Sequence, residues 1–105
     1  MGSSMIARIW KGRVLAKDYE AYTQFMIERA IPDYQQTTGF VKLSFLRQLK
    51  GEEGHFTLIT YWENLEVIKN FAGAAYETAK YYPEDVGFLL EMPSLVEHYE
   101  VFGEV

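Results

Sequence analysis

The 105-residue sequence predicts an α+β domain with elements in the order β-α-β-β-α-β. Three observations support this fold class. Four segments alternate apolar and polar residues with the period of a strand. Two segments between them carry apolar residues at helical spacing. A glycine-containing turn joins the two middle strands, as in a hairpin. Right-handed crossovers then give a ferredoxin-like, four-stranded antiparallel sheet with both helices on one face.

The first quarter of the chain predicts a strand and then a helix. Residues 5–14 (MIARIWKGRV) alternate, with Arg8 and Trp10 on one face. Asp18 can cap the helix that follows through its side-chain oxygen. Pro32 should kink or end that helix, because proline lacks an N–H and clashes with the preceding turn. The helix's apolar stripe consists of Tyr19, Tyr22, Phe25, Met26 and Ala30.

The middle of the chain predicts a hairpin. Residues 40–49 (FVKLSFLRQL) and 55–62 (HFTLITYW) are rich in strand-forming side chains. Residues 50–54 (KGEEG) supply the turn, because Gly51 and Gly54 can adopt positive φ.

The last part predicts a second helix and a fourth strand. The helix starts at Asn64, and Glu66 in its first turn suits the positive end of the helix dipole. Pro83 ends the helical pattern, and a short extended or helical piece follows at 88–91. The last strand is expected at 95–102. The helix's apolar stripe consists of Leu65, Ile68, Ala72, Ala75 and Ala79.

Composition limits the class of protein. Apolar residues make up 49% and charged residues 24%, which indicates one globular domain over residues 1–105. The net charge of −5 and the lack of a basic cluster argue against nucleic-acid binding. Without cysteine there is no disulfide or thiolate site, and the two histidines lack metal-ligand spacing. No apolar run reaches the ~20 residues of a membrane span, so we expect a cytoplasmic protein that does not contact membranes.

Aromatic residues make up 16% of the chain, more than one small core easily hides. The surplus indicates a cavity lined with rings or a subunit interface. The predicted sheet supports the interface, because each face carries large side chains: Leu58 and Trp62 on one, Ile59 and Tyr61 on the other. We therefore expect a homodimer whose two sheets pack face to face into a barrel-like core.

Small residues at 72–75 (AGAA) leave two structural alternatives open. They can let the second helix lie close to the sheet, as close packing of interiors favours. Alternatively, they leave a void walled by Trp62, Phe71 and Tyr76, as the aromatic surplus favours.

Two polar residues on neighbouring strands are candidates for chemistry. A strand histidine such as His98 is most often structural, but a pKa near neutrality also suits a base that removes a proton from carbon or phenol. Arg8 can hold an oxyanion through charge-assisted hydrogen bonds, or it can pair with Glu100 on the facing strand. Residues 81–85 (YYPED) are interpreted as a solvated helix exit with one tyrosine packed inward, rather than an acidic ligand loop.

Four blocks together resemble the antibiotic biosynthesis monooxygenase-like domain family. They are RIWKG (8–12), TYWENLEVIKNFAG (60–73), YYPED (81–85) and VEHYEV (96–101), and their order and spacing span nearly the whole chain. The resemblance implies a small dimeric α+β barrel. Some members oxidise polycyclic phenols or quinols with molecular oxygen and without flavin or metal, while a related branch degrades haem.

The resemblance also bears on individual residues. Trp62 matches a tryptophan that closes the third strand and lines the family's cavity. The haem-degrading branch uses an asparagine on the first strand and a haem-ligating histidine on the second helix. Here Trp10 stands near the first of these places, and residues 64–80 contain no histidine, which argues against haem degradation.

The resulting hypothesis is a cofactor-free monooxygenase that oxidises a small phenol, quinol or anthrone with molecular oxygen. His98 is cast as base or donor and Arg8 as anion stabiliser, with no metal or cofactor. Two alternatives stay open: a non-catalytic module that binds a small ligand or haem, and a dimer whose rings serve packing alone. The predicted substrate pocket consists of Trp10, Thr60, Trp62, Phe71, Tyr76 and Tyr82.

Overall fold

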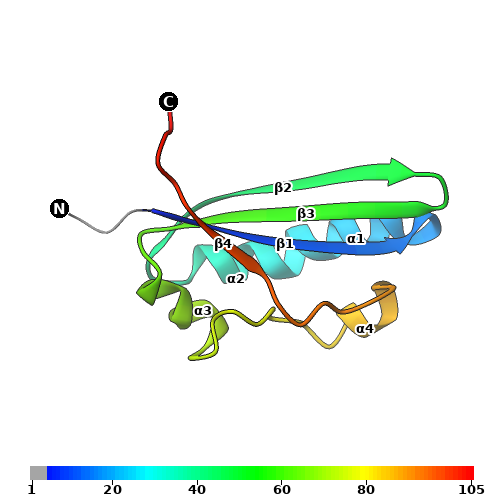
Figure 1. The fold of residues 1–105 in the computed structure, drawn as a ribbon. Coiled ribbons are helices and arrows are strands. Elements are labelled where there is room, and N and C mark those ends of the chain that lie inside the picture. The colour runs from blue at the N-terminus through cyan, green and yellow to red at the C-terminus, as the bar shows by residue number, and fades with distance from the viewer. Residues whose placement is uncertain (1–4) are drawn as a thin grey trace.

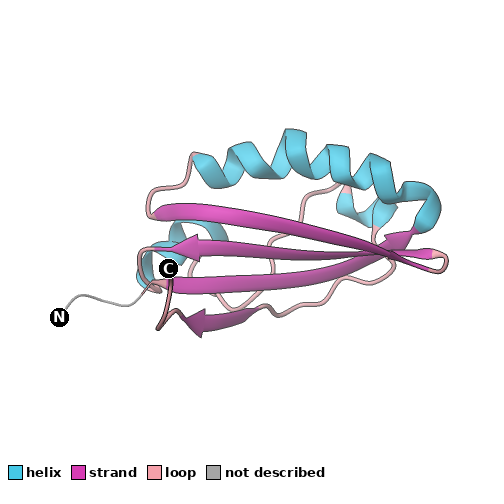
Figure 2. Ribbon diagram, turned by 90° about the horizontal axis from the view of Figure 1, so that it is seen from above, coloured by secondary structure: helices cyan, strands magenta, loops and turns pink. Residues whose placement is uncertain are grey.

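A computed structural model describes residues 5–105 and contains one four-stranded antiparallel sheet (Figures 1 and 2). The strands lie in the order β2-β3-β1-β4, with the helices on one face. This is the predicted ferredoxin-like topology, which is therefore confirmed. The strands are β1 (Ile6–Leu15), β2 (Phe40–Lys50), β3 (Glu53–Trp62) and β4 (Glu97–Glu100). Only β4 departs clearly from its predicted range, because it pairs with β1 along just four residues.

The first helical region is continuous through Pro32, so of the predicted kink or end, the end is wrong. It consists of η1 (Ala16–Asp18), α1 (Tyr19–Phe25), the π-helical η2 (Met26–Ala30) and α2 (Ile31–Gln35). In η2 the N–H of Ile31 donates to the Met26 carbonyl, five residues back. This wider turn accommodates the proline ring without breaking the helix. Asp18 does not cap α1 as predicted; its carboxylate lies 3.3 Å from the Lys17 ammonium instead.

The second helix begins as predicted but is much shorter. The Asn64 side-chain oxygen accepts the Val67 N–H at 3.0 Å. The helical turns η3 (Glu66–Ile68) and α3 (Lys69–Ala72) then end at Gly73, whose φ of 87° favours glycine. The predicted continuation to Ala79 is wrong, because its alanine stripe offers little apolar area to bury and short helices depend on packing. Residues 73–84, here called the cover segment, run as irregular chain to α4 (Asp85–Phe88).

The core lies between the sheet and the helices. Trp62, Tyr22, Ile68 and Val14 are fully buried there. On the opposite, helix-free face of the sheet, Ile9 stands opposite Ile59 in the β1–β3 register, and both are half-buried. Within residues 5–105, no helix has the length and apolarity that a bilayer crossing requires.

Gly12 leaves room for the Trp10 ring, so a larger residue at position 12 tests this packing. A Cβ at Gly12 would lie 2.2 Å from the indole. We expect Gly12→Ala to displace the ring and to lower the free energy of unfolding by about 1–3 kcal/mol, as overpacking does. Gly87→Ala is the matched control, because no atom lies within 4 Å of its added Cβ. Chemical denaturation followed by tryptophan fluorescence measures both, and equal stability of the two variants would contradict this account.

Candidate functional site

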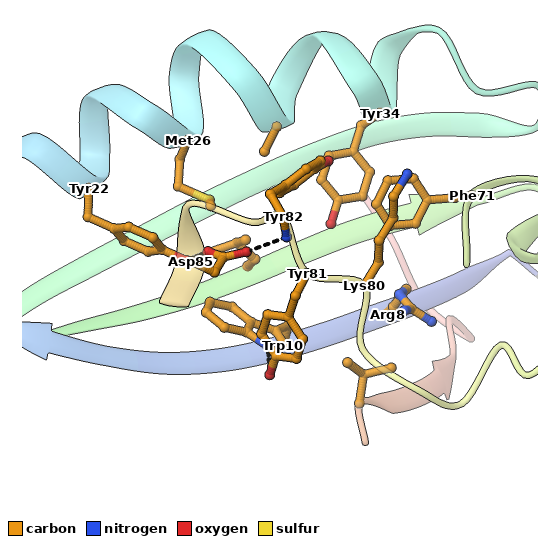
Figure 3. Close-up of a pocket in the computed structure, with 13 residues that line it drawn as sticks. Arg8, Trp10, Tyr22, Met26, Tyr34, Phe71, Lys80, Tyr81, Tyr82 and Asp85 are labelled. Carbon is orange, nitrogen blue, oxygen red and sulfur yellow. Dashed lines mark hydrogen bonds between the residues drawn. The ribbon is translucent and has the colours of Figure 1, made fainter. Parts of the chain in front are cut away.

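A small cavity lies between β1, the helical region α1–α2 and the cover segment (Figure 3). Its volume is about 30 Å³, room for about two water-sized molecules. Pockets for drug-sized ligands measure roughly 300–1,000 Å³. An aromatic ligand therefore enters only if the lining moves. The polar part of the lining consists of Arg8, Tyr22, Tyr34, Lys80, Tyr82 and Asp85.

Arg8 is 4% exposed and holds the cover segment to the sheet. One guanidinium nitrogen, Nη2, donates to the Thr78 carbonyl at 2.9 Å, and the other, Nη1, donates to the Tyr76 carbonyl. Nη1 also lies 3.0 Å from Nε2 of His98. No carboxylate in residues 5–105 forms an ion pair with Arg8. Arg8 is thus a buried cation whose three hydrogen-bond partners, two carbonyls and an imidazole, are all neutral.

The alternative in which Arg8 pairs with Glu100 is wrong. The β1–β4 register places Glu100 opposite Ile6 and places His98 opposite Arg8. Burial, assisted by the charge of Arg8, lowers the pKa of His98 to about 4. The imidazole is therefore neutral at neutral pH, and its Nε2 accepts the N–H of Arg8. His98 lies beside the ring of Tyr76 and outside the cavity lining.

Asp85 is a buried carboxylate that the sequence interpretation missed. It is 2% exposed and lines the cavity, whereas a solvated loop was expected. One oxygen accepts the Tyr22 hydroxyl at 2.8 Å, and the other accepts the Tyr82 backbone N–H at 2.7 Å. Burial raises the pKa of Asp85, although these two hydrogen bonds oppose the effect. An acidic side chain reaching back three residues to a backbone N–H is the geometry of a capping box. That spacing is the signal that could have revealed it.

A second carboxylate anchors the outer wall of the cavity. Asp33 accepts the Tyr82 hydroxyl at 2.6 Å and the Lys80 ammonium at 2.8 Å. The Lys80 ammonium also lies 4.4 Å from the centre of the Phe71 ring. Burial opposes ionisation of Asp33, but its hydrogen bonds with Lys80 and Tyr82 lower its pKa overall. These contacts tie the cover segment to the first helical region.

The structure brings some of the predicted pocket residues together and not others. Trp10, Phe71 and Tyr82 line the cavity with Arg8. The Trp10 indole N–H donates to the Tyr81 hydroxyl at 3.1 Å, and Tyr81 in turn donates to the Pro93 carbonyl.

Thr60, Trp62 and Tyr76 do not reach the cavity. Trp62 is fully buried, and its indole N–H donates to the Thr60 hydroxyl at 2.9 Å. Its ring packs against Phe71, which stands between it and the cavity. Tyr34, absent from the predicted set, stacks on Phe71 with 4.3 Å between ring centres and lines the cavity instead.

No metal-binding group of three histidine, aspartate or glutamate side chains gathers within residues 5–105. The sequence matches no family model. No curated protein matches it either.

The fold does have relatives among solved structures, where 28 chains match, some of unknown function. A proposed antibiotic biosynthesis monooxygenase from Nitrosomonas europaea superposes with a TM-score of 0.67 at 13% identity, covering 97% of this chain and 93% of that one. The cofactor-independent oxygenase SnoaB from Streptomyces nogalater gives 0.63 at 13% identity, with 98% of both chains covered. The haem degrader MhuD from Mycobacterium tuberculosis, solved with two haems in its active site, gives 0.63 at 23% identity, covering 95% and 98%.

These likenesses extend over nearly the full length of each chain. They agree with the resemblance drawn from the sequence blocks and with the strand order β2-β3-β1-β4. The chain therefore has the fold of the antibiotic biosynthesis monooxygenase-like proteins.

Proposed function

We propose that this protein binds a small aromatic compound as its phenolate or enolate anion and oxidises it with molecular oxygen, without a cofactor. The observation that carries the proposal is the buried Arg8 cation, which faces the cavity and has no carboxylate partner among residues 5–105. A buried charge without a counter-ion costs several kcal/mol. An anionic ligand would offset that cost.

The remaining lining suits the rest of such a ligand. Trp10, Phe71 and Tyr82 offer ring faces and edges for an aromatic body. Tyr34 presents a hydroxyl toward the cavity, where it can donate to the same oxyanion (Figure 3). The ligand gains access by displacement of the cover segment, which Gly73 joins to α3 at a positive φ.

The proposed reaction balances with oxygen as the only co-substrate. A deprotonated anthrone transfers one electron to oxygen, and the resulting radical and superoxide combine into a peroxide anion at the ring carbon, which takes back the proton lost earlier and becomes a hydroperoxide. Loss of water from it leaves a ketone. One oxygen atom enters the product, and the other leaves as water with the two hydrogens of the original CH₂ group. The protein's contribution is to stabilise the anion and to exclude bulk water.

Oxygen uptake by metal-stripped protein tests this proposal directly. With a panel of anthrones and dihydroquinones, we expect uptake matched by quinone formation. Arg8→Met should weaken binding of the anion about 10- to 100-fold, because a hydrogen bond to a charged group contributes about 1.5–3 kcal/mol. Arg47→Met is the matched control, since Arg47 already pairs with Glu20 at 2.8 Å. Uptake that is equal in wild type and Arg8→Met would contradict the proposed role of Arg8.

A binding module without turnover is the second candidate, and the small volume of the cavity, about 30 Å³, favours it. A protein that only carries a ligand does not need a path by which oxygen reaches the bound ligand. Tight binding of the aromatic anion without oxygen uptake would support this candidate. If no member of the panel binds, packing alone accounts for the rings.

His98 acts in this proposal as the residue that orients Arg8, in place of the base first expected. Its neutral state has a measurable consequence. Because its folded-state pKa is about 4 and its ordinary value is 6.5, the unfolded chain takes up the proton first as the pH falls. The contribution of neutral His98 to the free energy of unfolding is fully present above about pH 6.5, and it is lost as the pH falls toward 4.

We expect His98→Gln to remove this part of the pH dependence. Its amide oxygen can still accept the Arg8 N–H, so the fold and Arg8 stay in place. Urea denaturation from pH 7 to pH 4 measures the difference in unfolding free energy between wild type and variant. A difference that stays constant over this range would mean that His98 has the same pKa in the folded and unfolded protein, which would contradict its burial as a neutral group.

The proposed working form is a homodimer joined through the helix-free face of the sheet. Ile59 lies at the middle of that face, and we expect Ile59→Glu to separate the subunits by burying a charge at the interface. Val86→Glu serves as the control, because Val86 is 71% exposed on α4. Light scattering on a sizing column measures the mass. A monomeric wild type would refute the dimer.

A further inference from the structure

We infer that Asp85 is the proton acceptor of this site, the group that converts a bound phenol into the anion held by Arg8. The inference deepens the function proposed above, and its turnover readout rests on that function. It begins with the position of the carboxyl group. Asp85 is 2% exposed, and it lines the cavity with Arg8 and Tyr34.

The hydrogen bonds of Asp85 leave part of its acceptor capacity free. An ionised carboxylate offers about four lone-pair sites on two oxygens. The Tyr22 hydroxyl occupies one site on the first oxygen, and the Tyr82 N–H occupies one on the second. These two donors fix the carboxylate at the cavity wall (Figure 3). Each oxygen retains a site that can accept a proton from a ligand.

Few charges near Asp85 compete for that proton. On α1 its neighbour is Tyr22, whose pKa burial raises far above neutrality, so it stays a hydrogen-bond donor. The tyrosines Tyr34, Tyr81 and Tyr82 also have raised pKa values, mainly through burial. Among residues 5–105, the charge of Glu84 also raises the pKa of Asp85, by less than burial does.

No cation neutralises the Asp85 carboxylate in residues 5–105. Arg8 and Lys80 belong to the same lining, but they lie at its other end, beside Phe71 (Figure 3). Lys80 pairs with Asp33. The cavity therefore has a basic carboxylate at one end and an anion-binding guanidinium at the other.

The proton step that follows is simple. The ligand O–H or C–H bond breaks, its proton passes to an oxygen of Asp85, and its electron pair remains on the ligand. Conjugation spreads that charge across the ring toward Arg8. The protonated Asp85 later returns its proton to the oxygen atom that leaves as water. The site as a whole keeps its net charge during the transfer, which a buried site favours.

Binding of 4-nitrophenol tests the inference without turnover, because its visible absorbance reports the phenolate and a dye in weakly buffered solution reports released protons. In wild type below the pKa of the free phenol, we expect phenolate absorbance with no proton released. In Asp85→Asn we expect either one proton released per bound phenolate or no phenolate at all. Glu84→Gln, at a neighbouring exposed acid, should still give phenolate absorbance with no proton released, because Asp85 is retained.

Oxygen uptake with the anthrone panel supplies the second readout. Asp85→Asn should lower the rate by about 10²-fold or more, as loss of a general base does. In wild type the rate should fall as the pH drops through the raised pKa of Asp85. Tyr22→Phe, which keeps the carboxylate but removes one hydrogen bond to its charged form, should move that fall to higher pH.

The outcomes separate the two proposals. If wild type binds nitrophenol as phenolate without releasing a proton but consumes no oxygen, Asp85 remains the proton acceptor and the oxygenase is refuted. Uptake with an unchanged rate, pH profile and proton balance in Asp85→Asn would keep the oxygenase and overturn the inference. Phenolate absorbance without proton release in Asp85→Asn would also overturn it. Wild type that neither binds nitrophenol nor consumes oxygen would refute both.

Discussion

The guanidinium of Arg8 carries much of the structure around the cavity. It rises from the central part of the sheet and binds two carbonyls of the cover segment, those of Tyr76 and Thr78. These bonds replace the helix that the alanine-rich sequence predicts, because the segment now satisfies its backbone on a side chain of β1. The same contacts form one wall of the cavity, and within the described part of the chain they leave the positive charge of Arg8 without a negative partner.

This arrangement makes access of a ligand to the cavity depend on the charge of that ligand. Backbone carbonyls are weaker partners for a guanidinium than a carboxylate or phenolate, because an anion adds the attraction of opposite charges to the hydrogen bond. An anion that reaches Arg8 competes directly with the bonds that hold the cover segment down. The ligand's own charge therefore contributes to opening the space that it needs. Lys80 and Tyr82, both bound to Asp33, hold the other side of the segment against α2.

Sequence patterns predicted the sheet well and the site only in part. The strands follow from alternation, and the hairpin turn fixes their register, so β1 and β3 agree with the structure to within two residues at each end. The predicted length of the second helix was wrong, because the helix propensity of Ala75 and Ala79 cannot replace the packing of an apolar face. Trp62 lies on the expected face, but only tertiary packing places Phe71 between it and the cavity. Asp85 escaped notice because its burial depends on Tyr22, a residue 63 positions away.

The separation of Asp85 from Arg8 is the feature that gives the cavity chemical meaning. Had the two formed an ion pair, each would have neutralised the other, and the pKa of the carboxyl would have fallen. Held apart, the carboxylate keeps a raised pKa and the guanidinium keeps an unmet demand for an anion. Both conditions destabilise the empty protein, and a bound acidic aromatic relieves both at once by giving its proton to one end and its charge to the other. Packing alone requires neither charge inside the cavity, whereas the proposed function uses both: the carboxylate takes the proton and the guanidinium holds the anion.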